Sequence, residues 1–121
     1  MPVLPGASFQ LHDSQSGEWT HLWFVISAPS GPDGDALCVN ITTNDPFNDR
    51  TCVLVPGDGH PAIREDSVVA YGFAKILPTA RLAAATPAFV MQYPANASIL
   101  RKILAGAKNS KHLAPKFKKL L

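Results

Sequence analysis

Three short segments of the sequence carry side chains that could perform chemistry on the phosphate backbone of RNA. His21 opens an apolar run, and Thr42 and Thr43 close another. Arg64 and Asp66, two positions apart, precede a third. A histidine and a carboxylate can exchange protons with the 2′-hydroxyl and the leaving oxygen, while an arginine neutralises the charge that grows on phosphorus. These residue types therefore indicate phosphoryl-transfer chemistry on RNA.

Each of these residues also has a purely structural interpretation. Arg64 and Asp66 could form a solvated cluster of charges beside Glu65. His21 could simply hydrogen-bond a neighbouring backbone group, and threonine is common at strand ends because it fits the pleat. Both interpretations stay open at this point, since residue type and spacing do not separate them.

Charge divides the chain into an acidic part and a basic part. Residues 1–66 hold all nine Asp and Glu residues but only two of the eleven Lys and Arg residues. Residues 67–121 hold the other nine basic residues and no acidic residue. A basic half of this kind attracts phosphates, an anionic partner or its own acidic half.

Residues 110–121 are interpreted as a basic C-terminal tail. Lysines with an interleaved aromatic side chain, here Phe117, can hold single-stranded nucleic acid by charge and stacking. The tail could instead be a solvated chain end, or it could lie against the acidic half of this chain or of a partner subunit. The candidate RNA-binding lysines in it are Lys111, Lys116, Lys118 and Lys119.

Alternating apolar residues and Gly/Pro turns predict a β-rich fold over the first two thirds of the chain. The later pattern predicts a short helix at 79–85, one more strand at 87–93 and a helix at 96–108 with an apolar stripe. Evenly spaced strands of this kind favour a small barrel or a sandwich. The earlier strands are predicted at residues 7–12, 21–27, 36–42, 51–55 and 67–75. The strand residues expected in the core are Val25, Leu37, Val39, Val53 and Val69.

Three of these runs resemble the cell-growth-inhibitor toxins of bacterial plasmid-maintenance modules, the PemK/MazF/Kid family. Members of that family share a strand ending in V-L-S, a strand ending in T-T or T-S, and an acidic residue before a hydrophobic strand that ends in basic residues. The corresponding runs here are residues 21–27 (HLWFVIS), 39–43 (VNITT) and 64–71 (REDSVVAY), the last of which leads to Lys75. The resemblance covers roughly residues 6–76.

Together with the strand pattern, this resemblance implies a mainly β fold: a small SH3-like barrel with one C-terminal helix and a short helical insertion, formed by residues 1–109. It also implies a homodimer that cuts single-stranded RNA without a metal or other cofactor, and an acidic antitoxin protein as a partner. In some members an R-x-D triplet and a histidine carry the cleavage. Arg64, Asp66 and His21 are the corresponding positions here, with Thr42 and Thr43 placed to position RNA.

The sequence departs from this family in two places. Residues 5–9 (PGASF) replace the usual G-D/E-[IV]-[WY] first strand, and Leu22-Trp23 stand where an Arg-Pro pair commonly begins the second strand. Two alternatives therefore remain: a non-catalytic SH3-like barrel that binds nucleic acid or a protein partner, and a toxin-fold protein that poisons a topoisomerase by protein contact. The nuclease needs its histidine, arginine and aspartate within one pocket, whereas a binding module needs only a continuous basic surface.

Cys38, Cys52 and His60 could suggest a metal site, but no Cys-x-x-Cys or His-x-x-x-His pair accompanies them, and structural zinc usually has four ligands in such pairs. We therefore predict no metal site and two free core thiols. No run approaches the roughly 18 apolar residues of a membrane span, and the N-terminus lacks a basic region followed by an apolar one. The expectation is a cytoplasmic protein without a membrane partner.

Overall fold

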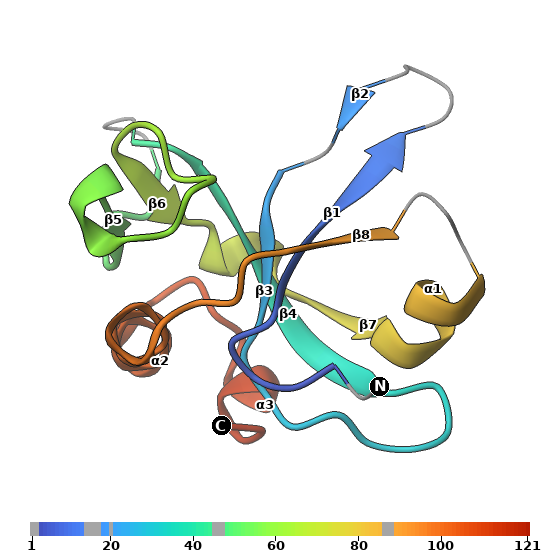
Figure 1. Ribbon diagram of the computed structural model, residues 1–121. Coiled ribbons are helices and arrows are strands. Elements are labelled where there is room, and N and C mark those ends of the chain that lie inside the picture. Colours follow the sequence, from blue (N-terminus) through green and yellow to red (C-terminus); the bar gives the residue numbers. More distant parts are fainter. Residues whose placement is uncertain (1–2, 14–17, 20, 45–47, 86–88) are drawn as a thin grey trace.

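The computed structural model describes residues 3–13, 18–19, 21–44, 48–85 and 89–121. They form a small mixed α/β domain in which helices flank an antiparallel sheet (Figure 1). The strands are β1 (Ser8–Asp13), β2 (Glu18–Trp19), β3 (Trp23–Val25), β4 (Asp35–Thr43), β5 (Val53–Leu54), β6 (Ser67–Val69), β7 (Lys75–Pro78) and β8 (Phe89–Gln92).

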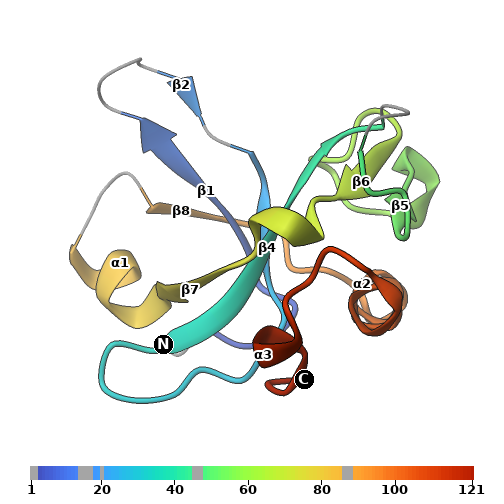
Figure 2. The same cartoon turned by 180° about the vertical axis from the view of Figure 1, so that it is seen from behind.

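β4 is the longest strand and organises the sheet. The strand order is β2-β1-β3-β4-β6-β5, with β7 also paired to β4 and β8 also paired to β1. The first half of β4 pairs with β7, from Asp35 opposite Pro78 to Cys38 opposite Lys75, and the end of β4 pairs with β6. Two arms of the sheet therefore diverge from β4, one carrying β7 and the other carrying β6 and β5 (Figures 1 and 2).

The prediction of a single strand at residues 67–75 is wrong, because the segment is divided into β6 and β7. Between them lies the 3₁₀ turn Tyr71–Phe73, closed by a hydrogen bond from the Phe73 N–H to the Ala70 carbonyl at 3.0 Å. The turn redirects the chain, so β6 and β7 pair with different parts of β4. It also carries Phe73 out of the sheet, which matters for the pocket described below.

The expected SH3-like barrel is not closed. Among the described strands, β5 pairs only with β6, β7 only with β4, and β8 only with β1, so hydrogen bonds do not join the ends of the sheet. Helix α1 (Thr79–Ala85) follows β7 and contacts β4 and β8. Alternation in the sequence predicts strands, but closure requires that distant edge strands meet with matching tilt and register.

The predicted helices are confirmed. α1 has the bounds predicted for residues 79–85, and α2 (Ala97–Asn109) follows Asn96, whose Oδ1 accepts the Ile99 N–H at 2.8 Å and caps the helix. None of the helices in the described ranges is long and apolar enough to cross a membrane. The strand predicted at 87–93 corresponds to β8, and residues 87 and 88 lie outside the described part of the chain.

Two apolar clusters lie on opposite faces of the sheet, because successive residues of a strand point to opposite sides. The larger cluster contains Phe24 and Leu37 of the sheet and Ile103 of α2. The smaller cluster contains Phe9 and Trp23. Four of the predicted core residues are fully buried: Val25, Leu37, Val39 and Val69.

Val53 differs from the prediction, since it is only half-buried. Its neighbour Leu54 occupies the buried side of β5, and alternation along the strand turns Val53 outward. β5 is also an edge strand, so nothing in the described sheet covers it from the side away from β6.

Helix α2 packs closely against Tyr71 and Cys52 at Gly106. The Tyr71 hydroxyl donates a hydrogen bond to the Ile103 carbonyl at 2.6 Å. A Cβ atom on residue 106 would lie 2.3 Å from that hydroxyl oxygen, which is closer than two unbonded atoms can approach. Glycine is therefore required for this contact, which fixes α2 over the turn between β6 and β7.

Residues 110–121, interpreted above as a tail, pack against the domain. Leu113 is 3% exposed and belongs to the larger core cluster, and Phe117 and Leu121 pack against that cluster. Figure 2 shows this C-terminal segment lying beside the sheet. Three apolar side chains of the segment therefore take part in the core that stabilises the domain.

A lysine of the same segment stabilises the end of α2. Helix α3 (Pro115–Lys118) places the Lys118 Nζ atom 2.7 Å from the Ser110 carbonyl and 3.3 Å from the Lys108 carbonyl, and the ammonium group donates to both. A cation is favourable at a helix C-terminus, where unpaired carbonyls give a partial negative charge. Lys118 therefore has a structural partner inside the chain.

The two cysteines lie in different apolar clusters, Cys52 in the larger and Cys38 in the smaller, and both are free. Strand β6 lies between β4 and β5, so the segments that carry the cysteines do not pair directly. Burial raises the pKa of the Cys38 thiol to about 12 and also raises that of Cys52. Both thiols are therefore protonated side chains of the core.

Candidate functional site

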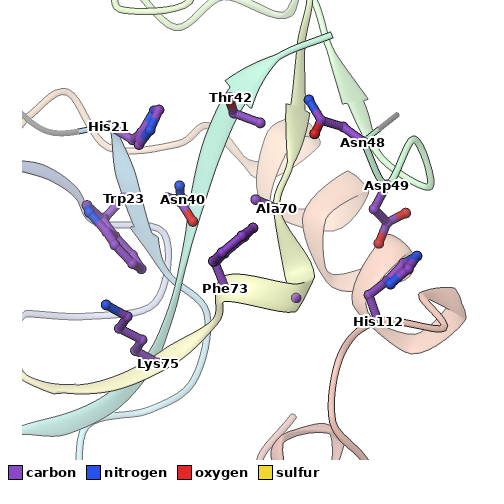
Figure 3. A pocket seen from close by; sticks show the side chains of 11 residues that line it. His21, Trp23, Asn40, Thr42, Asn48, Asp49, Ala70, Phe73, Lys75 and His112 are labelled. Atoms are coloured by element: carbon purple, nitrogen blue, oxygen red, sulfur yellow. The ribbon is translucent and has the colours of Figure 1, made fainter. Parts of the chain in front are cut away.

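An open pocket of about 550 Å³ lies over one face of the sheet, beside β3 and β4 (Figure 3). Its walls come from five separate segments of the chain, which the fold brings together. The lining residues are His21, Trp23, Asn40, Thr42, Asn48, Asp49, Ala70, Gly72, Phe73, Lys75 and His112.

The floor of the pocket follows from strand pairing. β3 and β4 are antiparallel, with Trp23 directly opposite Asn40. His21 lies two residues before Trp23, and Thr42 lies two residues after Asn40, so the period of two places all four side chains on the same face. The sequence predicted two of these four residues, His21 and Thr42, as functional.

Phe73 is the most exposed aromatic side chain of the pocket, at 70% exposure. Trp23 lies deeper, stacked on Phe9 with 6.5 Å between the ring centroids. The Lys75 Nζ atom lies 5.9 Å from the centroid of the Trp23 ring, close enough for a cation–π contact. An exposed ring next to a cation suits a ligand that combines a flat base with a phosphate.

Asp49 and His112 form another part of the wall and lie beside one another in Figure 3. One oxygen of the Asp49 carboxylate accepts hydrogen bonds from the Thr51 N–H and hydroxyl, and the other accepts the Ser110 hydroxyl at 2.7 Å. The Ser110 oxygen in turn accepts the His112 N–H at 3.0 Å. Asp49 therefore holds the segment that carries His112 against the pocket.

The charge state of Asp49 suits this role. Partial burial raises its pKa, but hydrogen bonds from Thr51 and Ser110 and the positive charge of His112 outweigh that effect and hold the pKa below its ordinary value. Asp49 is therefore an ionised carboxylate at neutral pH. The contact also joins the acidic half of the sequence to the basic half, as does the ion pair between Asp58 and Lys102 at 3.0 Å.

Arg64 and Asp66 do not line this pocket. Both side chains are exposed, in the segment that leads into β6, and the Asp66 carbonyl accepts the Asn44 N–H at 3.2 Å. Thr43 is exposed and pairs with Ser67 at the same end of the β4–β6 ladder. The structure thus brings His21 and Thr42 to the pocket, and gathers Thr43 with the Arg64–Asp66 segment at the end of β4.

The four lysines predicted to bind RNA fall into different environments. Lys111 and Lys119 are exposed, and Lys116 is exposed with its Nζ atom 5.1 Å from the centroid of the Phe117 ring. Lys118 is half-buried by its contacts with the carbonyls at the end of α2. None of the four lines the described pocket, whose cation is Lys75.

Sequence reasoning missed most of the pocket. Phe73 was hidden inside a segment interpreted as one strand, although Gly72 in that segment was a signal for a break. His112 was assigned to a tail, and Asp49 was not singled out. No local pattern links these residues, since only the tertiary fold brings the segments around residues 21, 40, 49, 73 and 112 together.

His60 lies elsewhere and is a buried structural residue. Its Nδ1 atom accepts the Ala62 N–H at 3.1 Å, so the ring proton is on Nε2, which donates to the Tyr93 carbonyl at 2.5 Å. Nε2 also lies 3.0 Å from the Ser8 hydroxyl. Burial lowers the pKa of His60, although the hydrogen bond to Tyr93 opposes that effect.

Cys38, Cys52 and His60 are the residues that could suggest a metal site in the sequence. Within the described ranges, no three His, Cys, Asp or Glu side chains gather closely enough to hold a metal ion. Cys52 and Cys38 are separated between two clusters, and His60 makes the protein contacts given above.

Comparison with known proteins found no match for this chain among protein-family models, curated proteins or solved structures. The resemblance to the PemK/MazF/Kid family therefore rests on the three sequence runs given above.

Proposed function

We propose that this protein is a toxin-like endoribonuclease that binds single-stranded RNA in the pocket and cleaves it without a metal ion or other cofactor. The observation that carries the proposal is that two histidines and a lysine, His21, His112 and Lys75, line the same pocket as the exposed ring of Phe73. Figure 3 shows the two histidines at opposite ends of the pocket with Phe73 between them.

For cleavage, the bound strand has to lie with its scissile phosphate within reach of both imidazoles, which then supply the two proton transfers. One histidine accepts the proton of the 2′-hydroxyl, O2′ forms a bond to phosphorus, the P–O5′ bond breaks, and the other histidine donates a proton to O5′. The products are a 2′,3′-cyclic phosphate and a 5′-hydroxyl end. Lys75 stabilises the negative charge that grows on the phosphate oxygens, and Thr42 positions the chain beside it.

The family resemblance suggests a different set, in which Arg64 and Asp66 act with His21. Their exposed position, near the end of β4 and just before the start of β6, suits contact with RNA that runs out of the pocket. We keep this set as a second catalytic proposal beside the two-histidine set, and substitutions of the two sets distinguish between them.

The test is incubation of the purified protein with single-stranded RNA in EDTA, followed by analysis of the product ends. We expect cyclic phosphate and 5′-hydroxyl ends, and a loss of about 100-fold or more in rate for either His21→Ala or His112→Ala. Arg81→Ala, which removes an exposed cation on α1, is the matched control. If Arg64→Ala and Asp66→Ala abolish cleavage while His112→Ala does not, the resemblance-based set is correct instead. No cleavage by the unmodified protein would contradict both.

A non-catalytic RNA-binding module is the second candidate. It is favoured by the exposure of Phe73 beside Lys75, because stacking and charge alone hold single strands without any proton transfer. Tight binding of RNA in EDTA with no change in product length would select this candidate.

The proposed partners follow from the resemblance. We propose a homodimer, with an acidic antitoxin protein that binds the basic C-terminal half, in the cytoplasm. Light scattering of the purified protein tests the dimer: a mass of one chain at micromolar concentration would contradict it.

A further inference from the structure

One polar atom of the pocket is left without a partner. Asn40 is 7% exposed and lines the pocket, and its Oδ1 atom is buried with no hydrogen-bond partner in the described structure. Most buried side-chain oxygens in folded proteins are paired, because an unpaired one gives up its bonds to water without replacement. An exception at the floor of a pocket needs an explanation.

Asn40 lies where one face of β4 changes from apolar core residues to polar pocket residues. Along one face of β4, the side chains change from apolar Ala36 and Cys38, in the smaller core cluster, to polar Asn40 and Thr42, in the pocket. Asn40 stands at the boundary, where an apolar residue would complete the cluster. The fold thus accepts a destabilising amide at the one β4 position where core and pocket meet.

The backbone of Asn40 is held by the sheet on both sides. Its carbonyl accepts the Ala70 N–H at 2.8 Å, and Asn40 lies opposite Trp23 of β3. Figure 3 draws the side chain between Trp23 and Phe73. A hydrogen-bond acceptor between two aromatic rings is suited to read the edge of a ring stacked on one of them.

We infer that Asn40 is the residue that selects the nucleobase, and that the pocket takes a base whose Watson–Crick edge places an exocyclic amine beside an unprotonated ring nitrogen, adenine or cytosine. This inference rests on the proposed binding of single-stranded RNA. Oδ1 accepts a hydrogen bond from the amine, and the amide nitrogen can donate to the adjacent ring nitrogen of either base. An exocyclic amine projects beyond the ring and reaches a recessed oxygen. The ring N–H of uracil lies between two carbonyl oxygens. Uracil in the same position would bring these oxygens against the wall that holds the Asn40 Oδ1 atom.

The first test uses mononucleotides, so that it does not depend on cleavage. The unmodified protein is titrated with AMP, CMP, UMP and the monophosphate of purine riboside, which is adenosine without its amine. We expect AMP and CMP to bind about 5- to 150-fold more tightly than UMP and the purine nucleotide, as a well-placed base contact gives. Asn40→Leu removes the acceptor at similar size and should make the four affinities equal. Asn109→Leu, an exposed position at the end of α2, is the control.

A second measurement separates recognition from a structural role. Replacing an unpaired buried amide by an apolar side chain of the same shape is neutral or stabilising, so the melting temperature of Asn40→Leu should equal or exceed that of the unmodified protein. A clear fall in melting temperature would show that Asn40 has a structural partner and would overturn the inference.

The outcomes distinguish this inference from the proposed function. Selective binding of AMP and CMP without any cleavage of RNA would support base selection by Asn40 and contradict the nuclease. Cleavage of RNA with equal affinity for all four nucleotides would support the nuclease and overturn base selection. Failure to bind any of the four nucleotides would contradict base selection as well as the pocket's role.

Discussion

The surroundings of His60 and the pocket differ in whether their polar and aromatic side chains are paired and buried. The ring of His60 is buried and both of its nitrogens bond to the protein, through Ala62 and Tyr93. The pocket instead leaves the Asn40 oxygen unpaired and the Phe73 ring in water. A histidine whose two nitrogens are paired inside the protein stabilises the fold, whereas the unpaired oxygen at the pocket wall remains able to accept a hydrogen bond from a ligand.

The largest effect on stability is expected at His60. His60→Ala would remove one of the two donors to the Tyr93 carbonyl, which keeps the Ser8 hydroxyl, and would leave the Ala62 N–H without its partner. It would also open a cavity beside Phe24, whose ring packs edge-on against His60. We expect a loss of about 3 to 5 kcal/mol in the free energy of unfolding, measured by urea titration. RNA binding by the fraction that stays folded should be unchanged. An unchanged unfolding midpoint would show that His60 is not a structural residue.

The C-terminal segment provides the next largest effect. Leu113→Ala should lower the free energy of unfolding by about 2 to 5 kcal/mol, because the side chain is buried in the larger core cluster. Lys111→Ala, at an exposed position two residues away, should leave it unchanged. Equal melting temperatures for the two variants would mean that residues 110–121 do not stabilise the domain in solution.

Phe73→Ala changes the pocket and leaves the core intact. Its ring is largely in water, so the unfolding midpoint should change little, whereas affinity for single-stranded RNA should fall by about 1 to 3 kcal/mol, the usual contribution of one stacked base. Filter binding at fixed salt measures the affinity. Phe73→Trp should retain it. Loss of stability with unchanged affinity would reverse the roles assigned to the two regions.

The smallest effect is a dependence of stability on pH. Because burial lowers the pKa of His60, the unfolded chain takes up its proton at a higher pH than the folded chain does. Stability from this residue is complete above the ordinary histidine pKa of about 6.5 and falls as the pH drops below it toward the folded pKa. Melting temperatures between about pH 7.5 and 5.5 should show the fall, and His60→Gln should weaken it. A slope that is unchanged in His60→Gln would assign it to other groups.

The sequence was sufficient to predict most of the local structure. Alternation and turn residues located β1, β3, β4 and β5, and the apolar stripe and Asn96 located α2, because these signals lie within a few neighbouring residues. The break at Tyr71–Phe73 was missed because a single 3₁₀ turn leaves the apolar pattern of the segment intact. Closure of the barrel was overestimated because strand patterns do not specify how edge strands meet.

The site was predicted less completely than the fold. His21 and Thr42 were chosen from their positions at strand ends, and the fold places both in the pocket. His112 and Asn40 could not be chosen in this way. His112 reaches the pocket through a hydrogen-bonded contact between Asp49 and Ser110, which are far apart in the sequence. Asn40 stands out only when its burial and its missing partner are known.

The most direct test of the central claim is to observe which side chains a single strand contacts. Aromatic ¹H–¹³C spectra would be recorded while 2′-O-methyl RNA, which lacks the attacking hydroxyl, is added in EDTA. We expect the resonances of Phe73, His21 and His112 to shift together and saturably, while those of His60 stay in place. Unchanged pocket resonances while the strand binds elsewhere, or no shifted resonance at all, would show that the pocket does not bind single-stranded RNA.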